Sequence, residues 1–155
     1  MAGNRLLNLK KSLDNYFLSN FTLAPIDYMG QTLDKTPNSV TQWVRFSEVG
    51  PDPTPRGTME GVTAFFQQAI IDVACFAKIP STDMGAVHKL ADAVILALER
   101  KNIPLVAYDL GGTPTAQYIR VFEAQMRYMG LDNSLGFAAE YAVVVLPCVW
   151  DEKQA

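Results

Sequence analysis

The stretch IIDVACFAKIPSTDMGAVHKLADAVILALERKN, residues 70–102, decides the fold because it joins a strand pattern directly to a helix pattern. Apolar residues occupy both alternating faces of its first half, which is typical of a central strand covered on both sides, by a helix on one and by the second helix or a partner on the other. After PSTD, residues 80–83, which offers candidate N-cap side chains, apolar positions recur every three or four residues. This spacing predicts a helix over about 83–101 that ends before Pro104.

The β-prone run that leads into this unit begins at Gly57 and is too long for one straight strand, since strands are usually about 5–6 residues long. We expect a bend, bulge or register change at Gly61 or at the polar pair Gln67–Gln68. Asp72 is the charged exception in the apolar strand. A lone carboxylate in such a strand is more often partnered or at a rim than catalytic.

The sequence before residue 57 predicts one helix and two strands. From about residue 4 to 20, leucine and aromatic side chains recur at helical spacing and predict an amphipathic N-terminal helix. Leu7 and Leu18 project from a second side of it, which indicates either a wide core stripe or a contact with a neighbouring chain. An irregular connection with a short strand near residues 26–29 follows, and the alternation over residues 40–49 predicts a half-buried strand.

Four residues in and after that strand are candidates for an interface. Trp43 and Arg45 lie on its less apolar face, and both residue types are favoured at protein interfaces, although such a pair more often reflects local stacking. The segment GPDPTPRG, residues 50–57, holds three prolines between two glycines and predicts a stiff protruding turn. Asp52 and Arg56 would place opposite charges on this turn, as a connector or as a contact with another subunit.

The sequence after the second helix predicts β structure. Residues 104–110 predict a short strand, and the glycine pair at 111–112 forms a turn without the features of a phosphate loop. Thr115–Met129 and residues 138–150 predict a closing antiparallel hairpin, and we expect the polar residues 151–155 to be a loose tail. The order of elements describes a single α+β domain over 1–155, with a mostly antiparallel sheet and two helices packed on it.

Composition excludes several classes of function. The 155-residue chain has a net charge of −3 and no Lys/Arg-rich run, so it lacks the basic face of a nucleic-acid binder. Its apolar runs are shorter than the ~20 residues of a membrane span, and no secretory signal is evident, so we expect a cytoplasmic protein without membrane contact. The mean hydropathy of +0.07 favours buried subunit contacts.

No residue cluster predicts a catalytic, cofactor-binding or metal site. Cys75 and Cys148 lie in strand patterns without metal-ligand spacing and are expected to be buried thiols. His88 stands four residues before Asp92 on the predicted helix, which indicates a surface pair rather than a catalytic dyad. With Asp72, these two and Asp109 are the only polar candidates for an enzyme, so we expect no enzymatic activity and no cofactor.

Several segments resemble the tail terminator proteins of long-tailed bacteriophages. The resemblance covers most of the chain, apart from the proline-rich segment and the Thr115–Met129 run, and depends on pattern and length more than on single residues. The similar pieces are RLLNLKKSLDNYF (5–17), QWVRF (42–46), RGTMEGV (56–62) flowing into IIDVAC, LADAVILAL (90–98) and YAVVVLPCVW (141–150).

The resemblance implies a virion structural protein at the head-tail junction, assembled in the host cytoplasm. Six copies would form a ring that caps the tail tube, stops its polymerisation and joins the neck. Its partners would be itself, the tail tube protein and a neck or head-completion protein, while DNA would pass through the lumen without specific binding. The acidic balance fits such a lumen.

Other functions stay open at this stage. A stopper, a head-completion protein or a tail-tube subunit would share the location but expose different faces. A cytoplasmic binding module would need only an exposed Trp43 and the proline-rich turn. A small enzyme would need a pocket with convergent polar groups.

Overall fold

The computed structural model describes residues 5–28, 33–59, 62–80 and 84–154, with the backbone alone at residues 5–6, 49–59, 62–67, 109 and 151–154. These residues include two α-helices, one short 3-10 helix and seven strands. In chain order they are α1 (Arg5–Asn20), β1 (Ile26–Tyr28), β2 (Gln42–Met59), β3 (Val62–Lys78), α2 (Ala86–Leu98), β4 (Asn102–Ala107), η1 (Tyr108–Leu110), β5 (Thr113–Val121), β6 (Gln125–Asp132) and β7 (Ala139–Gln154).

The seven strands form one sheet in the order β1-β2-β3-β7-β5-β4, with β6 paired to β7. The short β1 pairs with β2 in parallel, and the other pairs are antiparallel. The predicted α+β fold with a mostly antiparallel sheet is therefore confirmed. The predicted central strand is β3, which lies between β2 and β7.

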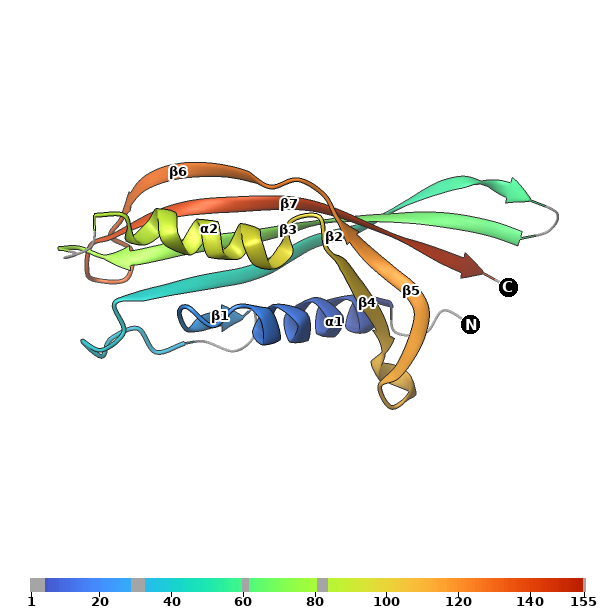
Figure 1. Cartoon of the computed structure of the whole chain (residues 1–155), viewed down its shortest axis with the longest axis horizontal. Helices are drawn as coiled ribbons and strands as arrows, with labels where there is room; N and C mark the ends of the chain where they lie inside the picture. The colour runs from blue at the N-terminus through green and yellow to red at the C-terminus, as the bar shows by residue number, and fades with distance from the viewer. Residues whose placement is uncertain (1–4, 29–32, 60–61, 81–83, 155) are drawn as a thin grey trace.

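Both helices cover the same face of this sheet (Figure 1). The predicted stripe of α1 is buried against it at Leu9, Leu13 and Phe17, whereas Leu7 and Leu18 are exposed. The core-facing side of α2 includes Val94 and Leu98. For the second side of β3 the prediction left two coverings open, the second helix or a partner. The second helix does not cover it, because Ile70 is 44% exposed on the helix-free face, whereas cover by a partner stays a prediction.

Helix α1 also closes one edge of the sheet. The Ser12 hydroxyl accepts a hydrogen bond from the Val106 backbone N–H at 3.0 Å, and the Asn8 side-chain oxygen accepts one from the Tyr108 N–H at 2.8 Å. Edge strands present unpaired backbone groups that invite pairing with other chains. Side chains of α1 therefore occupy one backbone N–H of β4 and the first backbone N–H of η1.

The second helix is shorter than predicted at both ends. Its N-cap is Gly85, without a side-chain cap, and the predicted cap residues 81–83 lie outside the described residues. At its other end Glu99 is already extended, and Arg100 has a φ of 58°, in the left-handed region. This local geometry turns the chain into β4 before the predicted end at residue 101.

The proline-rich segment continues β2 instead of forming the predicted turn at 50–57. It pairs with β3 as far as Met59↔Val62, and the reversal falls at residues 60–61, outside the described part. Proline is tolerated there because β1 pairs only with residues 44–46, which leaves the rest of β2 at the sheet edge. The pairing register between β2 and β3 shifts between Val49 and Asp52 of β2, opposite Ala69 of β3. This position lies next to Gln67–Gln68, one of the two places where the sequence predicted an irregularity.

Residues 151–154 are likewise part of a strand, not a loose tail. They extend β7 and pair with residues 63–66 of β3, because the long β3 offers them a ladder partner. We call residues 52–59, 62–69 and 148–154 together the arm. Figure 1 shows that the arm extends beyond both helices.

The closing hairpin is confirmed, with one change. The predicted strand over Thr115–Met129 divides into β5 and β6, which are separated by residues 122–124. Strand β6 forms the antiparallel hairpin with β7, whereas β5 pairs mainly with β4 and touches β7 at Arg120 and Val121.

Candidate subunit interface

The four interface candidates all lie on β2, but in different environments. Trp43 is fully buried, and Arg45, two residues later on the same face, is 46% exposed. Asp52 and Arg56 belong to the backbone of the arm, and their side chains lie outside the described part. Of the two candidates whose side chains the structure describes, Arg45 lies on an exposed surface and Trp43 does not.

Trp43 is the centre of an aromatic ladder on the helix-free face. Its ring stacks on Phe76 of β3 at a centroid distance of 5.2 Å, and Phe76 stacks on Tyr141 of β7 at 5.3 Å. Phe137 meets Trp43 edge-on, and Leu33 packs on the same cluster. The expectation of an exposed Trp43 is wrong because the segment before β2 folds over this end of the sheet.

An ion pair fixes that covering segment. The Lys35 ammonium lies 2.8 Å from a carboxylate oxygen of Asp27 in β1, and both side chains are buried. The backbone N–H of Leu33 donates to the other carboxylate oxygen at 3.1 Å. The Lys78 ammonium in turn donates to the backbone oxygens of Lys35 at 2.6 Å and Pro37 at 3.2 Å. The segment is thus attached to β1 and to β3.

The charge of Asp27 is stabilised in this arrangement. Burial raises its pKa, but hydrogen bonds from Lys35 and Leu33 and the positive charges of Lys35 and Arg45 outweigh burial, so the net pKa is lowered. Arg45 lies 3.7 Å from the same carboxylate and over the Phe76 ring at 5.2 Å. The sequence pattern missed this ion pair because its members are separated by an irregular segment.

Beyond the ladder, the helix-free face is open, and we call this part the open face. Alternation along β2, β3, β7 and β6 places two cross-strand rows on it. By register these rows are Arg45, Ala74, Val143 and Arg127, and Ser47, Asp72, Val145 and Gln125. Ala74, Val143 and Val145 are partly exposed. The open face therefore has small apolar side chains at its centre and an arginine at each end of one row.

Asp72 is the carboxylate at the centre of this face. Burial raises its pKa above the ordinary value. Within the described part of the chain, no hydrogen bond or ion pair engages its carboxylate; the Ser47 hydroxyl donates instead to the Asp72 backbone oxygen at 3.2 Å. A partly desolvated carboxylate of this kind gains stability from a donor supplied by another molecule.

The polar candidates for catalysis do not converge. The exposed His88 ring stacks on Tyr128 of β6 at 6.0 Å, Asp72 lies on the opposite face of the sheet, and the side chain of Asp109 is outside the described part. Burial raises the thiol pKa of Cys75 and Cys148 to about 12, which keeps both thiols protonated and unreactive. Over the described ranges there is no cluster of three or more His, Cys, Asp or Glu that could hold a metal ion.

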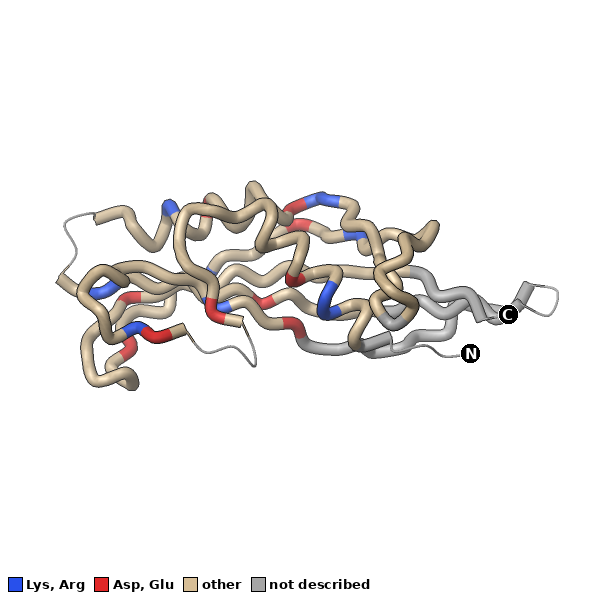
Figure 2. The backbone as a smooth tube through the Cα atoms, turned by 90° about the horizontal axis from the view of Figure 1, so that it is seen from below, with Lys and Arg blue, Asp and Glu red and all other residues tan. Residues whose placement is uncertain are grey.

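Two further surface properties bear on partners. Basic and acidic residues are scattered along the described backbone (Figure 2). No described helix combines the length and the apolar character that crossing a membrane requires.

Comparisons with known proteins identify the fold only. No protein-family model matches the chain, and no curated protein matches its sequence. Ten chains of solved structures are similar to it. One of them, whose name contains no functional term, aligns with a TM-score of 0.57 at 14% sequence identity, over 93% of this chain and 91% of its own length. At this identity, the likeness shows a shared fold and carries no function.

Proposed function

We propose that this chain is a virion structural protein similar to the tail terminators of long-tailed phages. In this proposal six copies form a ring that caps the completed tail tube, stops its polymerisation and forms the joining surface to the neck. The protein performs no catalysis and needs no cofactor. It acts at the head-tail junction of the virion after assembly in the host cytoplasm.

The observation that carries the proposal is the open face. Its centre is apolar and partly exposed at Ala74, Val143 and Val145, and charged groups flank it. Protein interfaces combine an apolar centre with a polar rim in this way. The uncovered carboxylate of Asp72 adds a group that a neighbouring subunit would satisfy.

The arm supports a ring in particular. It carries strand backbone beyond the helices (Figure 1). In a ring, the arm of one copy would contact a different surface of the next copy. Contacts between unlike surfaces generate rings when the rotation closes. The net charge of −3 suits a lumen through which DNA passes without specific binding.

One ring face would meet the tail tube protein, and the other would meet a neck or head-completion protein. A tail-tube subunit, a stopper or a head-completion protein remains the alternative, because each would use sheet faces for assembly. These alternatives differ in how association ends: a tube subunit forms open stacks, whereas a terminator forms a closed ring.

Native mass spectrometry of the purified chain, alone and with tail tubes assembled from the tube protein of the same phage, tests the proposal. The expected result is a hexamer, or a monomer that becomes hexameric on the tube end, with tube growth stopped in electron micrographs. A chain that stays monomeric with tubes present contradicts it. Stacks of indefinite length would identify a tube subunit instead.

A further inference from the structure

Strand β6 forms an outer edge of the sheet. It pairs with β7 on one side, and no described strand pairs with its other side. In Figure 1 it borders the molecule. Six of its eight residues are exposed and none is buried, so its side chains are accessible as well. An edge strand presents a row of backbone N–H and C=O groups without partners, which is a template for pairing with a further strand.

The side chains of β6 are largely apolar although they are exposed. The large apolar ones are Met126, Tyr128, Met129 and Leu131. Native proteins commonly protect an edge strand with charged side chains, prolines or bulges. Strand β6 has no proline, but it carries Arg127, Asp132 and a bulge. The placement of these three features decides what the edge can bind.

The bulged residue of β6 is Met129. Tyr128 pairs with Ala142 of β7, and Gly130 pairs with Tyr141, so Met129 has no residue of β7 opposite it. Gly130 has a φ of 94°, which is in the left-handed region that glycine adopts without strain. One inserted residue reverses the alternation of side chains along a strand. Residues that are an odd number of positions apart across the bulge therefore share one face.

The bulge places two opposite charges on the same face of β6. Arg127 pairs with Val143 on the open face. Asp132 pairs with Ala139, which belongs to the buried cluster of the ladder on the same helix-free side. Within the described ranges, no hydrogen bond or ion pair engages the Arg127 guanidinium. The backbone N–H of Ser134 donates to the Asp132 carboxylate at 2.8 Å and lowers its pKa, so this group stays charged.

Tyr128 and Leu131 share the opposite, helix-covered face for the same reason. Tyr128 pairs with Ala142, which packs against α2. The Tyr128 hydroxyl donates to Glu140, the residue opposite Leu131, at 3.1 Å. The two side chains are nevertheless 50% and 61% exposed. Apolar surface that a further strand would cover therefore lies on this side of the edge.

We propose that β6 of one copy pairs antiparallel with β6 of a second copy, across a two-fold axis that passes through the bulge. Arg127 of each copy then lies opposite Asp132 of the other copy. Tyr128 likewise lies opposite Leu131. In this register a cation faces an anion and an apolar side chain faces an apolar one, and the two-fold axis forms each pair twice. This self-complementarity is the reason that the occupant of the edge is a second copy.

The contact goes beyond the proposed ring. A contact between identical surfaces closes at two copies, whereas a ring needs contacts between unlike surfaces. Pairing through β6 uses neither the arm nor the apolar centre of the open face. The two copies would share one continuous sheet, with their helices on the same side of it.

Charge reversals test the pairing. Arg127→Glu alone and Asp132→Lys alone should each weaken dimerisation at least about tenfold, because each places two pairs of like charges in the contact. An equimolar mixture of the two variants should dimerise like the wild type, because one native and one reversed pair form between unlike copies. Asp132→Asn keeps an acceptor for the Ser134 N–H and removes only the charge, so it should cause a smaller loss.

A matched control changes the same charge where no strand edge is open. Arg120→Glu on β5 should leave dimerisation unchanged, because β5 is paired on both sides at this residue, with Asn102 of β4 and Val149 of β7. Circular dichroism should show an unchanged fold for every variant, because none of the substituted side chains is buried.

Sedimentation velocity and native mass over a concentration series measure the dimer, and hydrogen exchange locates it. The backbone N–H groups of β6 should exchange more slowly in the wild-type dimer than in the Arg127→Glu variant. A chain that stays monomeric throughout the series overturns the contact. A dimer that resists both reversals, or that leaves the exchange of β6 unchanged, also overturns it.

The same samples, mixed with tail tubes, separate this contact from the proposed function. Wild-type rings on tube ends without any dimer that depends on β6 would overturn the contact and leave the proposed function standing. Dimers that follow the charge reversals but never cap tubes would retain the contact and remove the proposed function.

Discussion

The two faces of the sheet differ in how completely the chain covers them. On β3, Ile71 is fully buried under the helices, whereas its neighbour Ile70 is 44% exposed on the other side. The helix-covered face is buried by the chain itself, because α1, α2 and five strands contribute buried residues to a single core. On the helix-free face, among the described residues, the Trp43 ladder forms a buried cluster. The comparison teaches that folding of one copy buries one face of the sheet and leaves side chains of the open face partly exposed.

The ladder should be the most sensitive part of the helix-free face. Trp43→Ala should lower the free energy of unfolding by about 3–5 kcal/mol, because it removes a fully buried ring and leaves a cavity between Phe76 and the covering segment. Urea unfolding followed by circular dichroism measures this loss. A loss below about 1 kcal/mol would mean that the segment over the ladder is not a fixed part of the fold.

A matched pair of isoleucines compares the two faces directly. Ile71→Ala should cost about 2–5 kcal/mol, because its side chain is fully buried, whereas Ile70→Ala should cost less than about 1 kcal/mol. Both variants remove the same atoms from adjacent positions of β3. A difference between their losses of unfolding free energy, measured by denaturant titration, therefore reflects the different surroundings of the two side chains. Equal losses in the free chain would show that the open face is covered after all.

The helix-covered face contains a carboxylate whose ionisation opposes folding. Glu48 of β2 has its pKa raised to about 7 by burial and by the charge of Asp14, against the opposing effect of Lys10. The folded state therefore binds this proton more tightly than the unfolded state. The contribution of the Glu48 carboxyl to stability is fully present below about pH 4.5, and it is lost as the pH rises to about 7.

Glu48→Gln should remove this pH dependence. The variant should be more stable than the wild type at pH 8, by up to about 3 kcal/mol, and the difference should shrink toward pH 5. Urea unfolding at both pH values gives the comparison. Glu123→Gln, the same change at an exposed residue, serves as the control. A Glu48 difference that is independent of pH would contradict the assignment.

The smallest effect on folding is expected on the open face. Arg45→Glu should change the free energy of unfolding by less than about 1 kcal/mol, because Arg45 is half exposed and its contact with Asp27 spans 3.7 Å. It should nevertheless weaken ring or tube association about tenfold or more, as should reversal at Arg56. Sedimentation velocity separates the two effects. Unchanged association would exclude these arginines from the interface.

Much of the fold could be predicted from local patterns. The two helices, the short β1, the central β3 and the closing hairpin all have a period or composition that the sequence displays. The course of the proline-rich segment could not be predicted, because its pairing depends on whether β3 continues opposite it. Residues 151–154 could not be predicted as a strand for the same reason. Their composition is polar, and they form a strand because they pair with residues 63–66 of β3, which are distant in the sequence.

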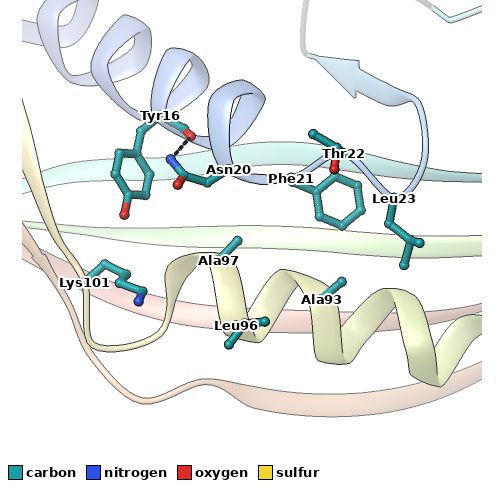
Figure 3. A pocket seen from close by; sticks show the side chains of 9 residues that line it. All are labelled: Tyr16, Asn20, Phe21, Thr22, Leu23, Ala93, Leu96, Ala97 and Lys101. Atoms are coloured by element: carbon teal, nitrogen blue, oxygen red, sulfur yellow. Dashed lines mark hydrogen bonds between the residues drawn. The ribbon is translucent and has the colours of Figure 1, made fainter.

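The candidate site was less predictable than the fold. Alternation placed Trp43 and Arg45 on one face, but it carries no information on which part of that face the chain covers. The burial of Trp43 depends on Lys35, which pairs with Asp27 across a segment without periodicity. A pocket between α1 and α2 (Figure 3) likewise arises from the ends of two helices that are more than 70 residues apart.

The two α1 side chains that bind the backbone of β4 and η1 have a consequence for aggregation. Ser12 and Asn8 occupy the N–H groups of Val106 and Tyr108 only while α1 is docked. If α1 detaches, the same event uncovers the apolar core and frees a strand edge that pairs readily with other chains. The solubility of this protein then depends on one local opening, and heat or an N-terminal truncation that loosens α1 should produce β-rich aggregates before the rest of the sheet unfolds.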